Sequence, residues 1–227
     1  MLLSSGQITA GPLILNTVQE VPVRRTGRYG CLVSNTRADV LAAARAILAE
    51  HSLADLTMRR LATDLGVRPN ALYWHFPNKQ SMLAALADDI LSPVISHAAT
   101  SPDDGDLADR IRAVATSMRR ALLAVPDSAE IVSSAWASGL SGRDAVDLVV
   151  GVARSGGLDI QTSAGVATAV CQLTIGLTIE EQTRTQMERL GVIEPSGRDF
   201  DAEFASGLSV IVAGAVAGRG VNGRPGR

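Results

Sequence analysis

The chain has 227 residues, of which 46% are apolar and 19% are charged, a composition typical of a folded globular protein. No window reaches the roughly 18 uninterrupted apolar residues expected of a membrane-spanning helix. The N-terminal arginines follow a mild apolar stretch, which is the reverse of a secretory signal, so we expect a cytoplasmic protein without a membrane partner. Cys31 and Cys171 have no Cys-x-x-Cys spacing, which predicts two reduced thiols rather than a disulfide framework or structural zinc.

Charge is distributed unevenly along the chain. The net charge is +2 over residues 1–33, zero over residues 34–91 and −4 over residues 92–227. A basic N-terminal part and an acidic C-terminal part are consistent with a nucleic-acid-binding domain joined to a second domain. Abundant alanine, few aromatic residues and few alternating β-branched runs predict an all-α fold.

The first helix is expected shortly after residue 34. The first 33 residues mix glycine, proline and serine without a sustained hydrophobic period, so they are expected to form a flexible arm. From Thr36 to His51, apolar residues recur every three or four positions, which predicts an amphipathic helix with Asn35 as its cap.

Two short helices are predicted next. The first follows Thr57, a capping residue, and ends at Gly66, where a left-handed residue can stop a helix. Pro69 favours the first position of the second, because its missing N–H has no helical partner there, and Pro77 ends it.

Longer helices are expected in the rest of the chain. One runs from about residue 79 to residue 99 and bends at Pro93. Others are predicted at about residues 107–124, 128–138, 143–155, 160–187 and 199–217. Residues 218–227 are rich in glycine, arginine and proline and are expected to be a disordered tail; their Gly-x-Gly-x-x-Gly match has no preceding strand and is interpreted as chance.

The predicted short helices have the arrangement of a helix-turn-helix, which presents its second helix to the DNA major groove. Tyr73, Trp74 and His75 are consecutive in that second helix. Because three directions of one helix cannot all face a core, at least one of these side chains must be exposed.

The same residues carry a family resemblance. The segments LTMRRLA (56–62), LGV (65–67), LYWHF (72–76) and NK (78–79) resemble the DNA-binding domain of the TetR family of bacterial transcriptional repressors, and most of all its tetracycline-repressor class. The resemblance covers about residues 36–91. Residues 118–123 and 175–182 resemble the effector domain of that family more loosely.

The resemblance implies a role for each matching residue. Thr57, Tyr73 and Lys79 would hold phosphates, while Arg59, Trp74 and His75 would lie at or near base edges and sugars. Residues 68–71 differ from the tetracycline-repressor class, so the operator sequence stays open. Asn70 can bridge an adenine edge, and Arg68 can contact either a guanine or a phosphate.

The effector side departs further from that class, whose members hold a magnesium–drug complex with histidines. The nearest positions here are Ile95 and Ser133, which argues against tetracycline. We also expect no metal and no other cofactor. The expected pocket is mostly apolar with a few polar groups, drawn from His97, Met118, Trp136, Thr168 and Gln172. Trp136 can either stack on a planar ligand or pack in the core.

The basic N-terminal segment has three readings. Arg24, Arg25 and Arg28 can form a minor-groove arm, as some helix-turn-helix proteins use, or remain solvated in an extension. The third reading is an over-long gene start, since family-like sequence begins after Val33.

Together these patterns predict a ligand-responsive, two-domain regulator. Residues 34–80 would bind a double-stranded operator, and residues 81–217 would bind a small molecule and form a homodimer through the last two helices. The alternative is a helical ligand-binding protein or enzyme without functional DNA binding, although the sequence lacks the usual nucleophile–base and metal motifs. The expected regulator is a repressor that a small molecule releases from its operator, and activation stays open because it depends on where the operator lies.

Overall fold

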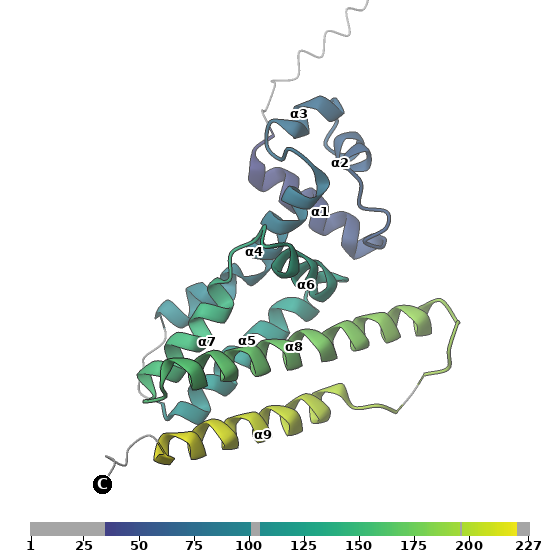
Figure 1. Ribbon diagram of the computed structural model, residues 1–227. Coiled ribbons are helices and arrows are strands. Elements are labelled where there is room, and N and C mark those ends of the chain that lie inside the picture. The colour runs from purple at the N-terminus through teal and green to yellow at the C-terminus, as the bar shows by residue number, and fades with distance from the viewer. Residues whose placement is uncertain (1–34, 101–104, 196, 222–227) are drawn as a thin grey trace, which may run out of the picture. The chain divides into compact units, whose positions relative to one another are not determined.

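A computed structural model describes residues 35–100, 105–195 and 197–221, which contain nine helices and no strand (Figure 1). The all-α prediction is confirmed. The expected N-terminal arm, with Arg24, Arg25 and Arg28, lies outside the described residues, as does Cys31.

The first helix is α1 (Arg37–Glu50), and its N-cap lies one residue later than expected. Thr36, rather than Asn35, is the cap: its hydroxyl accepts a hydrogen bond from the Asp39 amide at 3.2 Å, and the Asp39 carboxylate accepts one from the Thr36 amide at 2.7 Å. This reciprocal pair is a capping box. Asn35 instead donates a side-chain hydrogen bond to the Leu65 carbonyl at 3.3 Å.

The helix-turn-helix consists of α2 (Met58–Asp64) and α3 (Pro69–Tyr73), and the long α4 (Lys79–Thr100) follows. Helix α4 continues through Pro93. It packs against α1 and also against α5, α6 and α7, so a single helix connects the helix-turn-helix to the rest of the fold.

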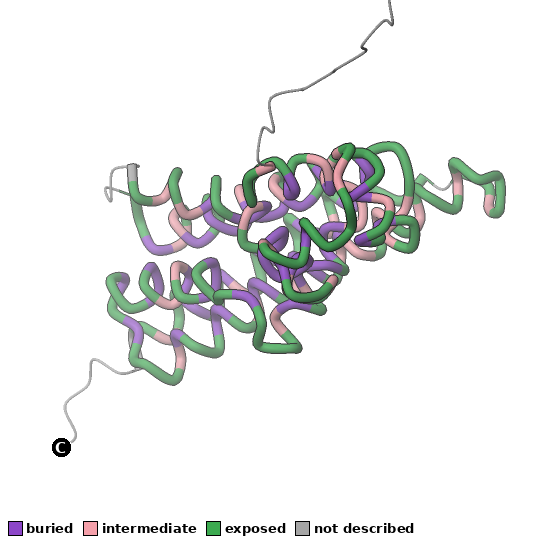
Figure 2. The backbone as a smooth tube through the Cα atoms, turned by 90° about the horizontal axis from the view of Figure 1, so that it is seen from above, coloured by how far each residue is buried: buried purple, intermediate pink, exposed green. Residues whose placement is uncertain are grey.

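The remaining five helices of the described residues pack against one another. They are α5 (Leu107–Leu123), α6 (Ser128–Ser138), α7 (Asp144–Ser155), α8 (Ile160–Arg189) and α9 (Phe200–Val221). Buried positions recur along the sides of these helices that face one another, and exposed positions occupy the outer sides (Figure 2). The apolar stripes seen in the sequence therefore become one continuous core.

Helices α8 and α9 are the longest antiparallel pair and lie side by side (Figure 1). Helix α9 continues to Val221, so the first four residues of the expected disordered tail are helical. Its outer face is exposed and made of small and apolar side chains, including Ala205, Val210 and Ala213.

Among the described residues, three helices are long and apolar enough to cross a membrane, judged by length and composition alone: α4, α8 and α9. The expectation that no segment qualifies used a stricter criterion, an uninterrupted apolar run, and does not hold by this measure. Helix α9 is the least buried of the three. Its apolar face therefore requires a cover that the single chain does not supply.

The buried Cys171 leads to a first prediction. Burial raises the pKa of its thiol to about 11, so only about one thousandth of it is thiolate at pH 8. Because the thiolate is the reactive form, we expect iodoacetamide to leave Cys171 unmodified in the folded protein and to alkylate it after denaturation. Mass spectrometry of the α8 peptide measures both states, and rapid alkylation without denaturant would contradict the burial.

Candidate nucleic-acid interface and ligand cavity

Local signals in the chain build the turn between α2 and α3. The Thr57 hydroxyl accepts a hydrogen bond from the Arg60 amide at 3.1 Å and caps α2, as predicted. Gly66 has φ +66°, in the left-handed region that glycine adopts without steric cost. Pro69 lies in the first turn of α3. These features fix the direction in which α3 leaves α2.

Apolar contacts anchor one side of α3. Leu72 and Phe76 are buried, and the Arg37 guanidinium lies over the Phe76 ring, 4.6 Å from its centroid. The inner side of the helix is therefore occupied by the core, and its other sides face solvent.

Helix α3 ends at Tyr73, so Trp74 and His75, expected within the helix, lie in the turn after it. At least one of these three side chains is exposed, as predicted. Trp74 is 90% exposed and Tyr73 is 47% exposed, while His75 is half-buried. Two adjacent exposed aromatic side chains at the end of a helix-turn-helix are more than a single scattered apolar residue, and they indicate a contact surface.

The polar residues predicted to contact DNA lie on the same part of the fold. Thr57, Arg59, Arg68 and Asn70 are all exposed on α2, on the turn or at the start of α3. Arg59 and Arg68 form no ion pair with any described residue. Their guanidinium groups are thus available to a polyanion.

Lys79 has a partner within the protein. Its Nζ atom donates a hydrogen bond to the Leu53 carbonyl at 3.4 Å, and the side chain is half-buried. An ammonium group has three N–H donors, so this contact leaves capacity for a phosphate.

A cleft of about 510 Å³ opens between α4, α5 and α7. Most of its wall is apolar, and the polar groups are few and separated. The lining residues are Val94, His97, Ala98, Arg110, Ala113, Val114, Ser117, Asp147, Leu148, Gly151 and Val152. An apolar wall with scattered polar groups is typical of a small-molecule site.

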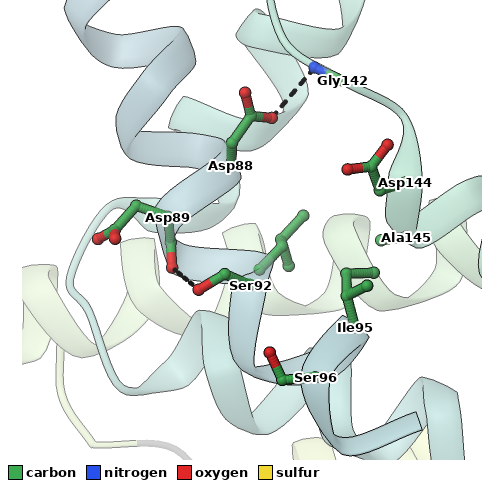
Figure 3. A pocket seen from close by; sticks show the side chains of 9 residues that line it. Asp88, Asp89, Ser92, Ile95, Ser96, Gly142, Asp144 and Ala145 are labelled. Carbon is green, nitrogen blue, oxygen red and sulfur yellow. Dashed lines mark hydrogen bonds between the residues drawn. The ribbon is translucent and has the colours of Figure 1, made fainter. Parts of the chain in front are cut away.

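A second cavity, of about 420 Å³, lies between α4 and the start of α7 (Figure 3). Asp88 and Asp144 approach it from opposite walls, and the Gly142 amide donates a hydrogen bond to Asp88 at 3.1 Å. Burial raises the pKa of Asp88, because the lost hydration outweighs this hydrogen bond. Ile95 also lines the cavity, where it offers no metal ligand.

The five residues predicted for one ligand pocket do not share one. Only His97 lines the apolar cleft. Met118 is fully buried in the core, and Trp136 is half-buried on α6 with the Arg143 guanidinium 6.0 Å from its ring centroid. Thr168 and Gln172 lie on the exposed face of α8. Sequence periodicity placed these residues on helices but could not tell which side of each helix faces the cleft.

Sequence reasoning missed the buried ionic cluster around Arg119. This side chain is only 4% exposed, and its Nη2 atom lies 2.6 Å from a Glu181 oxygen and 2.8 Å from an Asp201 oxygen. Its guanidinium also lies 5.1 Å from the Phe204 ring centroid. One side chain of α5 thereby connects α8 and α9.

Comparisons with known proteins agree with this geometry. The family model of bacterial regulatory proteins of the TetR family matches residues 40–86, and that of the tetracyclin repressor-like C-terminal domain matches residues 99–193. The tetracycline repressor protein class C of Escherichia coli is 31% identical over 182 residues, which are 78% of this chain and 82% of that protein. The chain belongs to the TetR family.

Solved structures of TetR-family regulators have the same fold. BioQ of Mycobacterium smegmatis is 40% identical with a TM-score of 0.72, and the match covers 81% of this chain and 98% of that one. BioQ solved with its double-stranded DNA operator is 38% identical with a TM-score of 0.66, covering 80% and 98%.

Membership of the TetR family decides between the two functions that the sequence left open. The chain is a ligand-responsive DNA-binding transcriptional regulator and not an enzyme. Its partners are an operator, a small-molecule effector and a second copy of itself. Regulators of this family are soluble DNA-binding proteins.

Proposed function

We propose that the protein is a cytoplasmic repressor that a small molecule releases from its operator. Residues 34–80 are the reading head, residues 81–217 are the effector and dimerisation domain, and α4 is the lever between them. The observation that carries this proposal is the exposed surface formed by Tyr73, Trp74 and the unpaired arginines of α2 and of the turn before α3. Buried Leu72 and Phe76 anchor the inner side of this segment.

The residues of the reading head have different roles. Thr57, Tyr73 and Lys79 contact phosphates and fix the register, since hydroxyl and ammonium groups suit phosphate oxygens. The groups nearest the base edges and sugars are Arg59, Trp74 and His75, joined by Arg68 and Asn70 at the start of α3. Asn70 can pair with an adenine edge, and Arg68 with a guanine or a phosphate.

A second copy of the chain covers the outer face of α8 and α9. On α8 this face presents Thr168 and Gln172, and on α9 it presents Ala205, Val210 and Ala213. Small side chains allow two such pairs to approach closely as a four-helix bundle. The dimer places two reading heads on half-sites about 34–36 Å apart.

The effector binds in the apolar cleft between α4, α5 and α7. Because α4 forms one wall of this cleft and also carries the reading head, an occupant that favours a different position of α4 changes the spacing of the two heads. The lining favours a compound that is mainly apolar, with a few polar groups for His97, Ser117 or Asp147.

Selection of bound DNA from random sequence tests the proposed function. We expect a two-fold-symmetric operator whose retardation by the protein survives non-specific competitor and weakens with salt. Recovery of no common sequence would contradict the proposal.

Replacing Lys79 with alanine is expected to weaken binding to all DNA sequences alike. The slope of log affinity against log salt concentration should fall by about 1, because one phosphate contact and its counterion are lost. Fluorescence anisotropy across a salt series measures the slope. Gln80→Ala is the matched control, being the exposed neutral neighbour. Reduced affinity with an unchanged slope would refute the phosphate role of Lys79.

Magnesium–tetracycline is expected neither to bind the protein nor to release its operator. Neither Ile95 nor Ser133 offers an imidazole to the ion, and no group of three His, Cys, Asp or Glu side chains in the described part of the chain is placed to hold a metal. Titration of the protein–operator complex with the drug, with and without magnesium, checks this. Release at micromolar drug would show that these positions do not decide binding.

A further inference from the structure

The loop between α1 and α2 uses both polar groups of one residue, Leu53, in contacts with other elements: the amide reaches the effector domain and the carbonyl reaches Lys79 of the reading head. The Leu53 amide donates a hydrogen bond to Asp127 Oδ2 at 2.7 Å, and the Leu53 carbonyl accepts one from Lys79 Nζ. The first bond is short, as expected for a charged acceptor. Among the described residues, it is the hydrogen bond that joins the reading head to an element beyond α4.

Asp127 adopts an unusual conformation at this contact. Its φ is +58°, and within the described residues it is the one non-glycine residue with positive φ. It also occupies the N-cap position of α6, where an aspartate normally accepts a hydrogen bond from its own helix, yet its side chain forms no such bond. The carboxylate is directed to Leu53 instead. The positive φ and the missing cap are both consistent with a side chain that is held by the contact with the loop.

The other side of the same turn is held by α8. Gln182 donates hydrogen bonds from Nε2 to the Leu122 carbonyl at 3.0 Å and to the Val125 carbonyl at 2.8 Å, and its Oε1 accepts one from the Ala129 amide at 3.4 Å. A movement of α8 or of the end of α5 is therefore passed to Asp127 through the turn that carries it. A cavity of about 350 Å³, lined by Asp127 and Gln182 among others, leaves space beside this turn.

We propose that Asp127 is a positioning residue that latches the reading head to the effector domain, and that this latch is a second connection between the two in addition to α4. Gln182 fixes the turn, and Asp127 accepts the hydrogen bond of the Leu53 amide. Lys79, in the reading head, donates a hydrogen bond to the Leu53 carbonyl. With the latch closed, the reading head has one orientation relative to the effector domain. With it open, the head moves about α4, and the fraction of dimers competent for the operator falls.

Three substitutions separate the latch from the fold of the turn. Asp127→Gly removes the carboxylate but suits the positive φ, so the turn is retained. Asp127→Asn keeps an acceptor oxygen and also tolerates the left-handed region, so it should rescue the latch. Asp106→Gly is the matched control, because Asp106 caps α5 and does not touch the reading head.

The readouts are hydrogen exchange of the loop and affinity for the selected operator, both measured on the full chain. In Asp127→Gly, we expect the Leu53 amide to exchange about tenfold faster and operator affinity to fall about tenfold, with the denaturation midpoint no lower than in the parent protein. Asp127→Asn and Asp106→Gly should resemble the parent in both readouts.

The outcomes are distinct from a failure of the DNA-binding proposal, because exchange of the Leu53 amide is measured without DNA. Unchanged exchange in Asp127→Gly would overturn the latch. Faster exchange with unchanged operator affinity would overturn its positioning role. An equal loss of affinity in Asp127→Asn would show that the acceptor oxygen is not what matters, and this too would overturn it.

Discussion

Replacing Trp74 with alanine is expected to lower operator affinity by about ten- to a hundredfold while changing the free energy of unfolding by less than about 0.5 kcal/mol. The indole is 90% exposed, so it contributes little to the core. On DNA it would lose that exposure, and a tryptophan at the centre of an interface commonly contributes more than any other residue type. The effect on binding and the effect on folding should therefore separate.

Fluorescence anisotropy with the selected operator measures the affinity, and urea denaturation measures the stability. Leu140→Ala is a suitable control, because Leu140 is also exposed but lies in the loop between α6 and α7. It should leave affinity unchanged. If Trp74→Ala bound the operator as tightly as the parent, then α3 would not present this side chain to DNA.

The helix-turn-helix could be predicted almost residue by residue, because its signals are local. Thr57 caps α2, Gly66 supplies the left-handed turn and Pro69 starts α3, and none of these requires a distant partner. The N-cap of α1 is likewise marked by local sequence, although Asn35 was predicted in place of Thr36. A capping box needs an acidic residue three positions after the cap, and Asp39 stands in that relation to Thr36 and not to Asn35.

The ligand cavity could not be predicted in the same way, because tertiary packing decides which side of a long helix faces it. Thr168 and Gln172 lie at helical spacing on α8, yet that stripe faces outward. Met118 lies one turn from Val114 on α5, but only Val114 reaches the cleft while Met118 fills the core. Helical periodicity shows which residues share one side of a helix, but it does not show which other helix that side packs against.

Packing also explains why α9 extends into the expected tail. Glycine disfavours helix, and Gly218 alone would end one. In the structure Gly218 is half-buried near Leu158 and Thr162, and the preceding Ala215 is buried. A closely packed neighbour thus offsets the low intrinsic propensity of the last turn.

Arg119 was missed for a similar reason, and it leads to the largest expected effect on stability. Its partners Glu181 and Asp201 follow it by 62 and 82 residues, so no local pattern marks it as buried. We expect Arg119→Met to lower the free energy of unfolding by about 3 kcal/mol, because breaking a buried ion pair leaves an uncompensated charge. Methionine keeps most of the aliphatic volume, while Glu181, which is 26% exposed, loses its partner.

Asp201→Asn is the matched control for this substitution. Asp201 is 87% exposed and contacts the same guanidinium. Because water solvates an exposed carboxylate well, removing its charge is expected to lower the free energy of unfolding by less than about 1 kcal/mol. Urea denaturation of both variants at a fixed protein concentration gives the comparison, with the m-value expected to stay constant. Because Arg119 holds α8 and α9 together, Arg119→Met should also weaken the dimer, which should then dissociate at a higher protein concentration than the parent dimer does. If Arg119→Met cost no more than Asp201→Asn, the contact with Glu181 would contribute nothing to stability.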